Sequence, residues 1–240
     1  MAEPLSHRSS TAGGWTSTAE FDEGLRQHML QVYNYMGLGL ALTGVVAFLV
    51  AATPALYTPI FGTPLKWAVM LAPLGFVFFL SFKIESISAS TAQMLFWAFC
   101  AVMGLSMASI FLVFTGASIA RVFFITAATF GAASLYGYTT KADLSKFGSF
   151  LFMGLIGIVI ASVVNIFLGS SALQFAISAI GVLVFTGLAA YDTQTIKTNY
   201  AEHAGSETNT KLAVMGALSL YLSFINLFHM LLYFMGDREG

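Results

Sequence analysis

Long runs of apolar residues, separated by short polar joints, dominate the chain. A helix that crosses a membrane needs about 20 mostly apolar residues, and seven stretches meet this requirement. These stretches are residues 32–52, 65–82, 91–114, 121–138, 147–168, 173–191 and 212–235. The runs are too continuous for the alternating strands of a membrane barrel. The pattern therefore predicts an all-α polytopic membrane protein with seven transmembrane helices.

The segments outside these stretches define the expected domain organisation. Residues 1–28 are polar and lack the basic start, short apolar core and cleavage site of a signal peptide. We expect a disordered cytosolic tail at 1–28, a transmembrane domain at 29–236 and a short C-terminal tail at 237–240. Two joints, at 115–120 and 169–172, are very short, so each is expected to connect antiparallel neighbouring helices.

Composition supports the membrane class and excludes several functions. Only 9% of the 240 residues are charged, whereas a soluble domain has about 25%. The net charge of -1 gives no basis for nucleic-acid binding. The chain has no Cys/His metal spacing and no Gly-rich phosphate loop, and its single cysteine, Cys100, cannot form an internal disulfide. We expect no cofactor, no tightly bound metal ion and the lipid bilayer as the surroundings.

The basic residues indicate how the seven helices are oriented. With the N-terminus in the cytosol, the inner segments carry seven Lys or Arg residues and the outer segments carry three. The inner ones are Arg8, Arg26, Lys83, Lys141, Lys146, Lys197 and Lys211; the outer ones are Lys66, Arg121 and Arg238. Cytoplasmic loops are enriched in Lys and Arg. This asymmetry predicts a cytosolic N-terminus and a C-terminus on the other side.

Asp192 is the first charge after an uncharged run that extends from Phe147 to Tyr191. It follows directly on the sixth apolar stretch, at the side predicted to be cytosolic. An ionisable group near membrane depth costs several kcal/mol unless it is paired or hydrated, so it marks a functional site by default. The alternative is simple placement at the water interface. We expect Asp192 to be functional.

The seventh stretch carries a stripe of polar residues. Ser219, Ser223, Asn226, His229 and Tyr233 fall within about 120° of arc on a helix. Such a stripe either forms hydrogen bonds between helices, worth roughly 0.6 kcal/mol each, or lines a hydrated path. A lone histidine without ligands at metal spacing favours a structural, hydrogen-bonded role for His229.

Lys83 and Glu85 end the second stretch on the same side as Asp192. Lys83 is a candidate ion partner for Asp192, with snorkelling of both charges to the interface as the alternative. An intramembrane aspartyl protease would need a second carboxylate, and none lies within the seven stretches. Ser223 and His229 are six residues, or about 9 Å, apart along a helix, which does not suit a Ser-His pair. No enzymatic activity is expected.

Three motifs carry a resemblance to a known family. Residues 191–194 (Tyr-Asp-Thr-Gln), residues 220–228 and the segment 130–167 resemble the Bax inhibitor family of membrane proteins, in particular its bacterial branch. The resemblance covers residues 20–236. It implies seven helices with the seventh in the centre, a cytosol-facing acidic latch and a passive, pH-sensitive calcium leak in the inner membrane.

One position departs from the family pattern. The resemblance implies that Asp192 pairs with an aspartate on helix seven, where this chain has Ser223. Two close carboxylates share a proton and titrate as a coupled pair, which a hydroxyl cannot do. We therefore expect a cation (calcium) leak with weakened pH gating, in which Asp192, Ser223 and Asn226 form the latch or path. The alternative function is a non-conducting protein that binds a membrane-bound protease or another quality-control partner.

Overall fold

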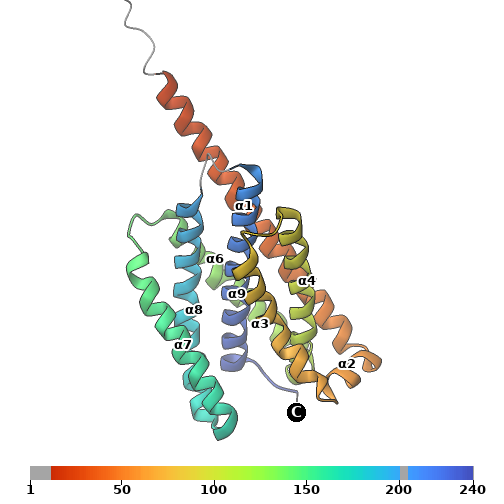
Figure 1. Cartoon of the computed structure of the whole chain (residues 1–240). Helices are drawn as coiled ribbons and strands as arrows, with labels where there is room; N and C mark the ends of the chain where they lie inside the picture. Colours follow the sequence, from red (N-terminus) through yellow and green to blue (C-terminus); the bar gives the residue numbers. More distant parts are fainter. Residues whose placement is uncertain (1–11, 201–204, 240) are drawn as a thin grey trace, which may run out of the picture.

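The chain forms a bundle of helices (Figure 1), described here from a computed structural model, and the predicted all-α fold is confirmed. The structure describes residues 12–200 and 205–239, and this part of the chain contains no β-strand. The helices are α1 (Ala12–Ala51), α2 (Pro54–Phe61), α3 (Leu65–Lys83), α4 (Ala89–Met107), α5 (Ile110–Val113), α6 (Gly116–Thr139), α7 (Ser145–Leu168), α8 (Ser171–Asn199) and α9 (Ser206–Met235).

Seven segments of the described residues are long and apolar enough to cross a membrane, as predicted. The third of them, Ala89–Val113, combines α4 with the short α5. The short helix α2 was not predicted. It starts at Pro54, whose missing N–H costs nothing in the first turn of a helix, and it lies between the first two spans.

The boundary predicted at residue 28 differs from the structure. Helix α1 begins at Ala12, so residues 12–28 are helical, whereas residues 1–11 of the expected tail lie outside the described residues. Leu25, Met29, Val32 and Met36 are buried at helical spacing on one face of α1. This apolar face packs onto the bundle and extends the helix beyond the most hydrophobic part of the first stretch.

Helix α9 lies at the centre of the bundle (Figure 1), as the family resemblance implied. It packs mainly against α1, α4, α6 and α8. In its most apolar window, 67% of the residues are buried, compared with 6% for α7. Helices α3 and α7 are therefore peripheral, and α7 packs chiefly on α8.

The two short joints behave differently. Helices α7 and α8 pack closely against each other, as expected, and the turn between them uses Gly169 at a positive φ of 60°. The joint after α5 does not make α4 and α6 close neighbours. Both of these helices pack against α9 instead, because the central helix occupies the position between them.

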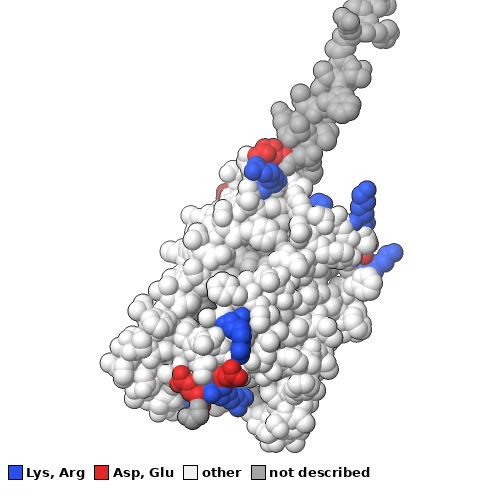
Figure 2. Space-filling model, turned by 180° about the vertical axis from the view of Figure 1, so that it is seen from behind, with Lys and Arg blue, Asp and Glu red and all other residues white. Residues whose placement is uncertain are grey.

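The charged residues gather toward the two ends of the bundle, with an uncharged band between them (Figure 2). The lysine-rich end contains the start of α9, the end of α8 and the turn between α3 and α4. There the Lys211 amino group lies 3.4 Å from the Glu85 carbonyl oxygen. At the opposite end, Arg121 forms an ion pair of 2.9 Å with Asp237 of the C-terminal segment.

Candidate functional site

The side chains of Asp192 and Ser223 join α8 to the central helix. The Ser223 hydroxyl donates a hydrogen bond of 2.7 Å to the Asp192 carboxylate. Helix α8 continues to Asn199, seven residues beyond Asp192, or about 10 Å along the axis. The sequence suggested that the helix ends at Asp192. In the structure Asp192 lies about two turns inside α8. Ser223 is buried, with 5% of its surface exposed.

The neighbours of Asp192 in the motif at 191–194 each fix a different part of the bundle. The ring of Tyr191 packs so closely on Gly148 of α7 that a Cβ at this glycine would lie only 2.7 Å from the ring. Thr193 shares a hydrogen bond of 2.6 Å with Ser134 of α6. Gln194 donates to the carbonyl of Ala142 and accepts from the N–H of Leu144, both at 2.8 Å. These contacts hold the α6–α7 loop and both flanking helices around the carboxylate.

Asp192 and Ser219 border two cavities. The larger cavity, about 830 Å³, is lined by residues of α3, α7, α8 and α9, including Ser223 and Asn226. The smaller, about 160 Å³, lies toward the lysine-rich end and is lined by α1, α8 and α9. The carboxylate and one serine thus stand between a membrane-embedded cavity and one near an end of the bundle.

The larger cavity follows α7 for most of its length. Its lining extends from Gly148 to Ile166, which are 18 residues, or about 27 Å, apart on a helix. The hydrocarbon core of a bilayer is about 30 Å thick. The walls are mostly apolar, and the polar groups are concentrated on α8 and α9 around Asp192.

The predicted stripe on helix seven divides into two groups. Ser219, Ser223 and Asn226 line the larger cavity, and the Asn226 amide donates to the Leu222 carbonyl at 2.8 Å. His229 and Tyr233 do not belong to this lining. The Tyr233 ring packs edge-on against Phe114 at the opposite end of the bundle, with 45% of Tyr233 exposed.

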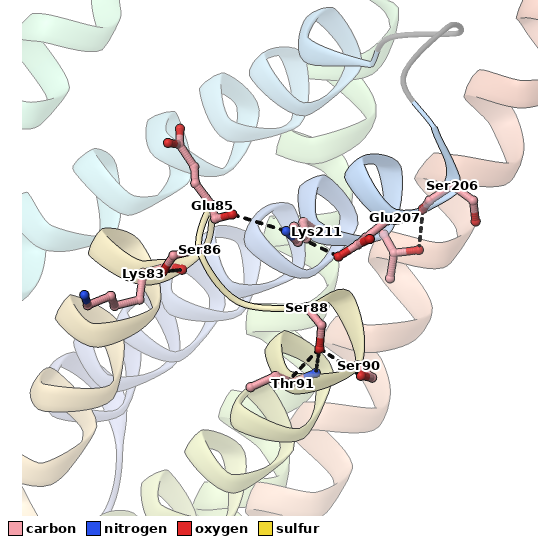
Figure 3. Close-up of polar contacts among 10 residues, drawn as sticks. Lys83, Glu85, Ser86, Ser88, Ser90, Thr91, Ser206, Glu207 and Lys211 are labelled. Carbon is pink, nitrogen blue, oxygen red and sulfur yellow. Dashed lines mark hydrogen bonds and ion pairs between the residues drawn. The ribbon is translucent and has the colours of Figure 1, made fainter.

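The structure does not bring Lys83 or Glu85 together with Asp192. The ion pairs formed by residues 12–200 and 205–239 do not include either side chain. Figure 3 shows the Lys83 side chain extending away from Glu85 and Lys211. Lys211 contacts the main-chain oxygen of Glu85 and pairs with Glu207 at 3.5 Å. Both predicted partners are exposed, as the snorkelling alternative describes.

His28 was missed as a site residue. It is 5% exposed and lines the smaller cavity together with Asp192. The polar composition of residues 1–28 led us to expect a disordered tail at this position. Leu25 and Met29, on either side of His28, are buried and are spaced as on one face of a helix, and this spacing could be seen in the sequence. Its ring lies 5.3 Å from that of Tyr200.

The fold and this site define the class: a polytopic helical membrane protein whose central helix meets a carboxylate between two cavities. The chain belongs to the Bax inhibitor family, because the family model described as "Inhibitor of apoptosis-promoting Bax1" matches residues 25–240. The inner membrane protein YbhL of Escherichia coli is 49% identical over 220 residues, which cover 90% of this chain and 94% of the relative.

Further relatives extend the comparison. An uncharacterised protein of Rickettsia prowazekii is 50% identical over 219 residues, covering 91% of this chain and 93% of its own length. An uncharacterised membrane protein of Streptococcus pyogenes is 34% identical over 221 residues, covering 91% and 96%. The chain is therefore a membrane protein of this family and is similar to an inner-membrane protein over nearly its whole length.

Proposed function

We propose that this protein is a passive, low-flux leak for cations, with calcium as the ion, in the bacterial inner membrane. The observation that carries the proposal is the position of Asp192. It borders both cavities, and its contact with the central helix is a hydrogen bond from the Ser223 hydroxyl. A carboxylate facing a water-accessible cavity attracts cations, and ionisable residues at membrane depth mark ion pathways.

A small movement of α8 against α9 would open this path. A hydrogen bond between membrane helices is worth roughly 0.6 kcal/mol, so the bond between Ser223 and Asp192 opens readily. When it opens, the smaller cavity joins the larger one, and Ser219 and Asn226 supply further oxygen ligands along α9. The low number of polar groups in the larger cavity agrees with a small flux.

The same geometry supports weak gating by protons. The titratable side chains that line the two cavities are Asp192, His28 and Tyr191. A carboxylate that faces a hydroxyl lacks the like-charge repulsion of a carboxylate pair, which is what couples protonation to opening in a proton-sharing latch. We therefore propose a leak whose pH dependence near neutrality is weak.

The site favours transport over catalysis. Among the residues that line the larger cavity, Asp192 is the one carboxylate, and an aspartyl protease needs two. The Ser223 hydroxyl donates a hydrogen bond to Asp192, and the residues that line the larger cavity include no histidine that could serve as the base of a Ser-His pair. We propose that the protein is not an enzyme.

The orientation is testable with fused reporters. Arg26, Lys83 and Lys211 lie at the lysine-rich end, and we propose that this end faces the cytosol, because cytoplasmic loops are enriched in Lys and Arg. A reporter fused before the N-terminus should be active in the cytosol, and one fused after Gly240 in the periplasm. Both reporters active on one side would contradict the proposed arrangement.

Calcium flux tests the proposal directly. Purified protein in proteoliposomes should pass calcium faster than protein-free liposomes, with similar rates at pH 6 and pH 8. Flux equal to that of empty liposomes would contradict the leak. That result would favour the alternative, a non-conducting protein that binds and modulates a membrane-bound protease or another quality-control partner.

A further inference from the structure

A second groove lies between α1 and α6, with Phe224 of α9 in its lining. It has a volume of about 490 Å³ and is lined mainly by apolar side chains, including Met29, Met36 and Phe130. Leu30 and Leu135, 49% and 64% exposed, stand among its lining residues. The groove thus opens sideways toward the region that the bilayer occupies.

The length of the groove matches one leaflet of a bilayer. On α1 its lining extends from Arg26 to Met36, and on α6 from Ala127 to Tyr138. Ten or eleven helical residues correspond to about 15–16 Å, which is half of the hydrocarbon thickness of about 30 Å. The groove therefore has the length of one acyl chain that enters from the lysine-rich end.

Positive charge lies at the mouth of the groove. Arg26 is one of its lining residues. It forms an ion pair of 3.0 Å with Glu23, but both side chains are exposed, and such a surface ion pair is worth only about 0–1 kcal/mol. Lys197 of α8 is bonded at 2.8 Å to the carbonyl of Tyr138 and lies 4.9 Å from the ring centre of that tyrosine. Basic pockets between membrane helices at this depth are suited to anionic headgroups.

The polar side chains at the floor of the groove form hydrogen bonds with one another. The Tyr33 hydroxyl and Ser134 lie 2.5 Å apart, and Ser134 lies 2.6 Å from Thr193. This closed network joins α1, α6 and α8 and leaves the apolar walls as the surface offered to a ligand. The ligand is therefore apolar along its length and anionic at one end.

We propose that the groove between α1 and α6 binds an anionic phospholipid, with one acyl chain between the two helices and the phosphate beside Arg26 and Lys197. The site is separate from the path at Asp192 and does not require ion passage. It would tie α1 to α6 in the leaflet of the lysine-rich end, where these helices meet through side chains such as Tyr33 and Ser134.

Native mass spectrometry of the full-length protein with added phosphatidylglycerol tests the site. Phosphatidylcholine with the same chains should bind about fivefold more weakly, because one cation near an anionic headgroup is worth about that factor. Arg26→Gln should weaken phosphatidylglycerol binding by a similar factor. Lys66→Gln, at the opposite end beside Trp67, is the matched control and should leave binding unchanged.

A second variant pair tests the groove itself. Gly131 lines the groove, and a Cβ there meets no atom within 4 Å, so Gly131→Leu fills the space without a clash. Binding should fall about tenfold, the equivalent of about two buried methylene groups. Gly157→Leu on exposed α7, where a Cβ also meets nothing, should change nothing. Equal binding of both lipids, displacement by soluble glycerol phosphate, or unchanged binding in Gly131→Leu would overturn the proposal.

Discussion

The two faces of the central helix α9 meet their neighbours in different ways. Tyr221 and Ser223 are two residues apart, which corresponds to about 200° of rotation around the helix axis. Their side chains therefore point to nearly opposite sides of α9. Tyr221 is fully buried, and its ring packs edge-on against Phe99 at 5.2 Å and Phe96 at 6.3 Å. Ser223 donates to Asp192 beside the two cavities.

The hydrogen bonds reinforce this difference. We call the side of α9 that carries Tyr221 the sealed face. Here the Tyr221 hydroxyl lies 2.6 Å from the Thr43 hydroxyl, and the Thr43 hydroxyl donates to the Cys100 carbonyl at 2.8 Å. These bonds join α1, α4 and α9, and the cavity that Thr43 borders on this side has a volume of only about 90 Å³, compared with about 830 Å³ beside Asp192. Buried hydrogen bonds therefore hold the central helix on the sealed face, whereas on the cavity face the hydrogen bond to α8 borders two cavities. If the protein conducts cations as proposed, we expect the motion that opens the path on the Asp192 side.

The strongest test of this comparison removes the anchor. Tyr221→Ala deletes a fully buried aromatic ring and leaves a cavity, which typically costs about 3–5 kcal/mol for an aromatic side chain. Tyr233→Ala, at an exposed ring that has an edge contact with Phe114, should cost about 1 kcal/mol. The unfolding free energy in detergent micelles measures both. Similar losses for the two variants would show that the sealed face is not the anchor.

Ser223→Asp changes the cavity face without touching the anchor. It places a second carboxylate opposite Asp192, and the two should share a proton. An interaction of about two pK units between them is worth about 2.7 kcal/mol, enough to make opening depend on pH.

Calcium flux between pH 6 and pH 8, compared between Ser223→Asp and the natural chain, is the measurement. The variant should acquire a pH transition that the natural chain lacks. A steep transition already present in the natural chain would point to His28, which lines the smaller cavity beside Asp192, as the titrating group.

The smallest expected effects concern single hydroxyl groups. Ser223→Ala should lower the unfolding free energy by about 0.6 kcal/mol, since the adjoining cavities allow water to replace the lost donor. Thr43→Val should cost more, about 1–2 kcal/mol, because it removes two hydrogen bonds between buried groups. The same unfolding experiment ranks the two. A larger loss for Ser223→Ala would reverse the assignment of anchor and moving face.

Much of the fold could be predicted because bilayer thickness sets the length of apolar stretches. The start of α3 at Leu65 and the end of α9 at Met235 coincide with the predicted limits. The extensions of α1 toward Ala12 and of α8 to Asn199 could not be read in the same way. Hydropathy reports the part of a helix inside hydrocarbon, and both helices continue into more polar sequence.

The candidate site was predictable only in part. Asp192 stands out by its charge, but its contact with Ser223, 31 residues away, followed from the family resemblance and not from periodicity. The proposed pairing with Lys83 failed because a charge at the end of a helix reaches solvent at little cost. His28 was missed because a single polar residue near a chain end gives no sign of the cavity that the packing of α1, α8 and α9 creates around it.

The most direct test of Asp192 as part of a cation path is calcium flux into proteoliposomes for Asp192→Asn beside Tyr221→Phe. Asp192→Asn removes a negative charge and Tyr221→Phe removes a hydroxyl group, both at nearly constant volume, and the two contacts lie on opposite faces of α9. With both proteins folded, Asp192→Asn should reduce calcium flux, and Tyr221→Phe should leave it close to that of the natural chain. Unchanged flux in Asp192→Asn across pH 6 to 8 would contradict the proposed role of the carboxylate.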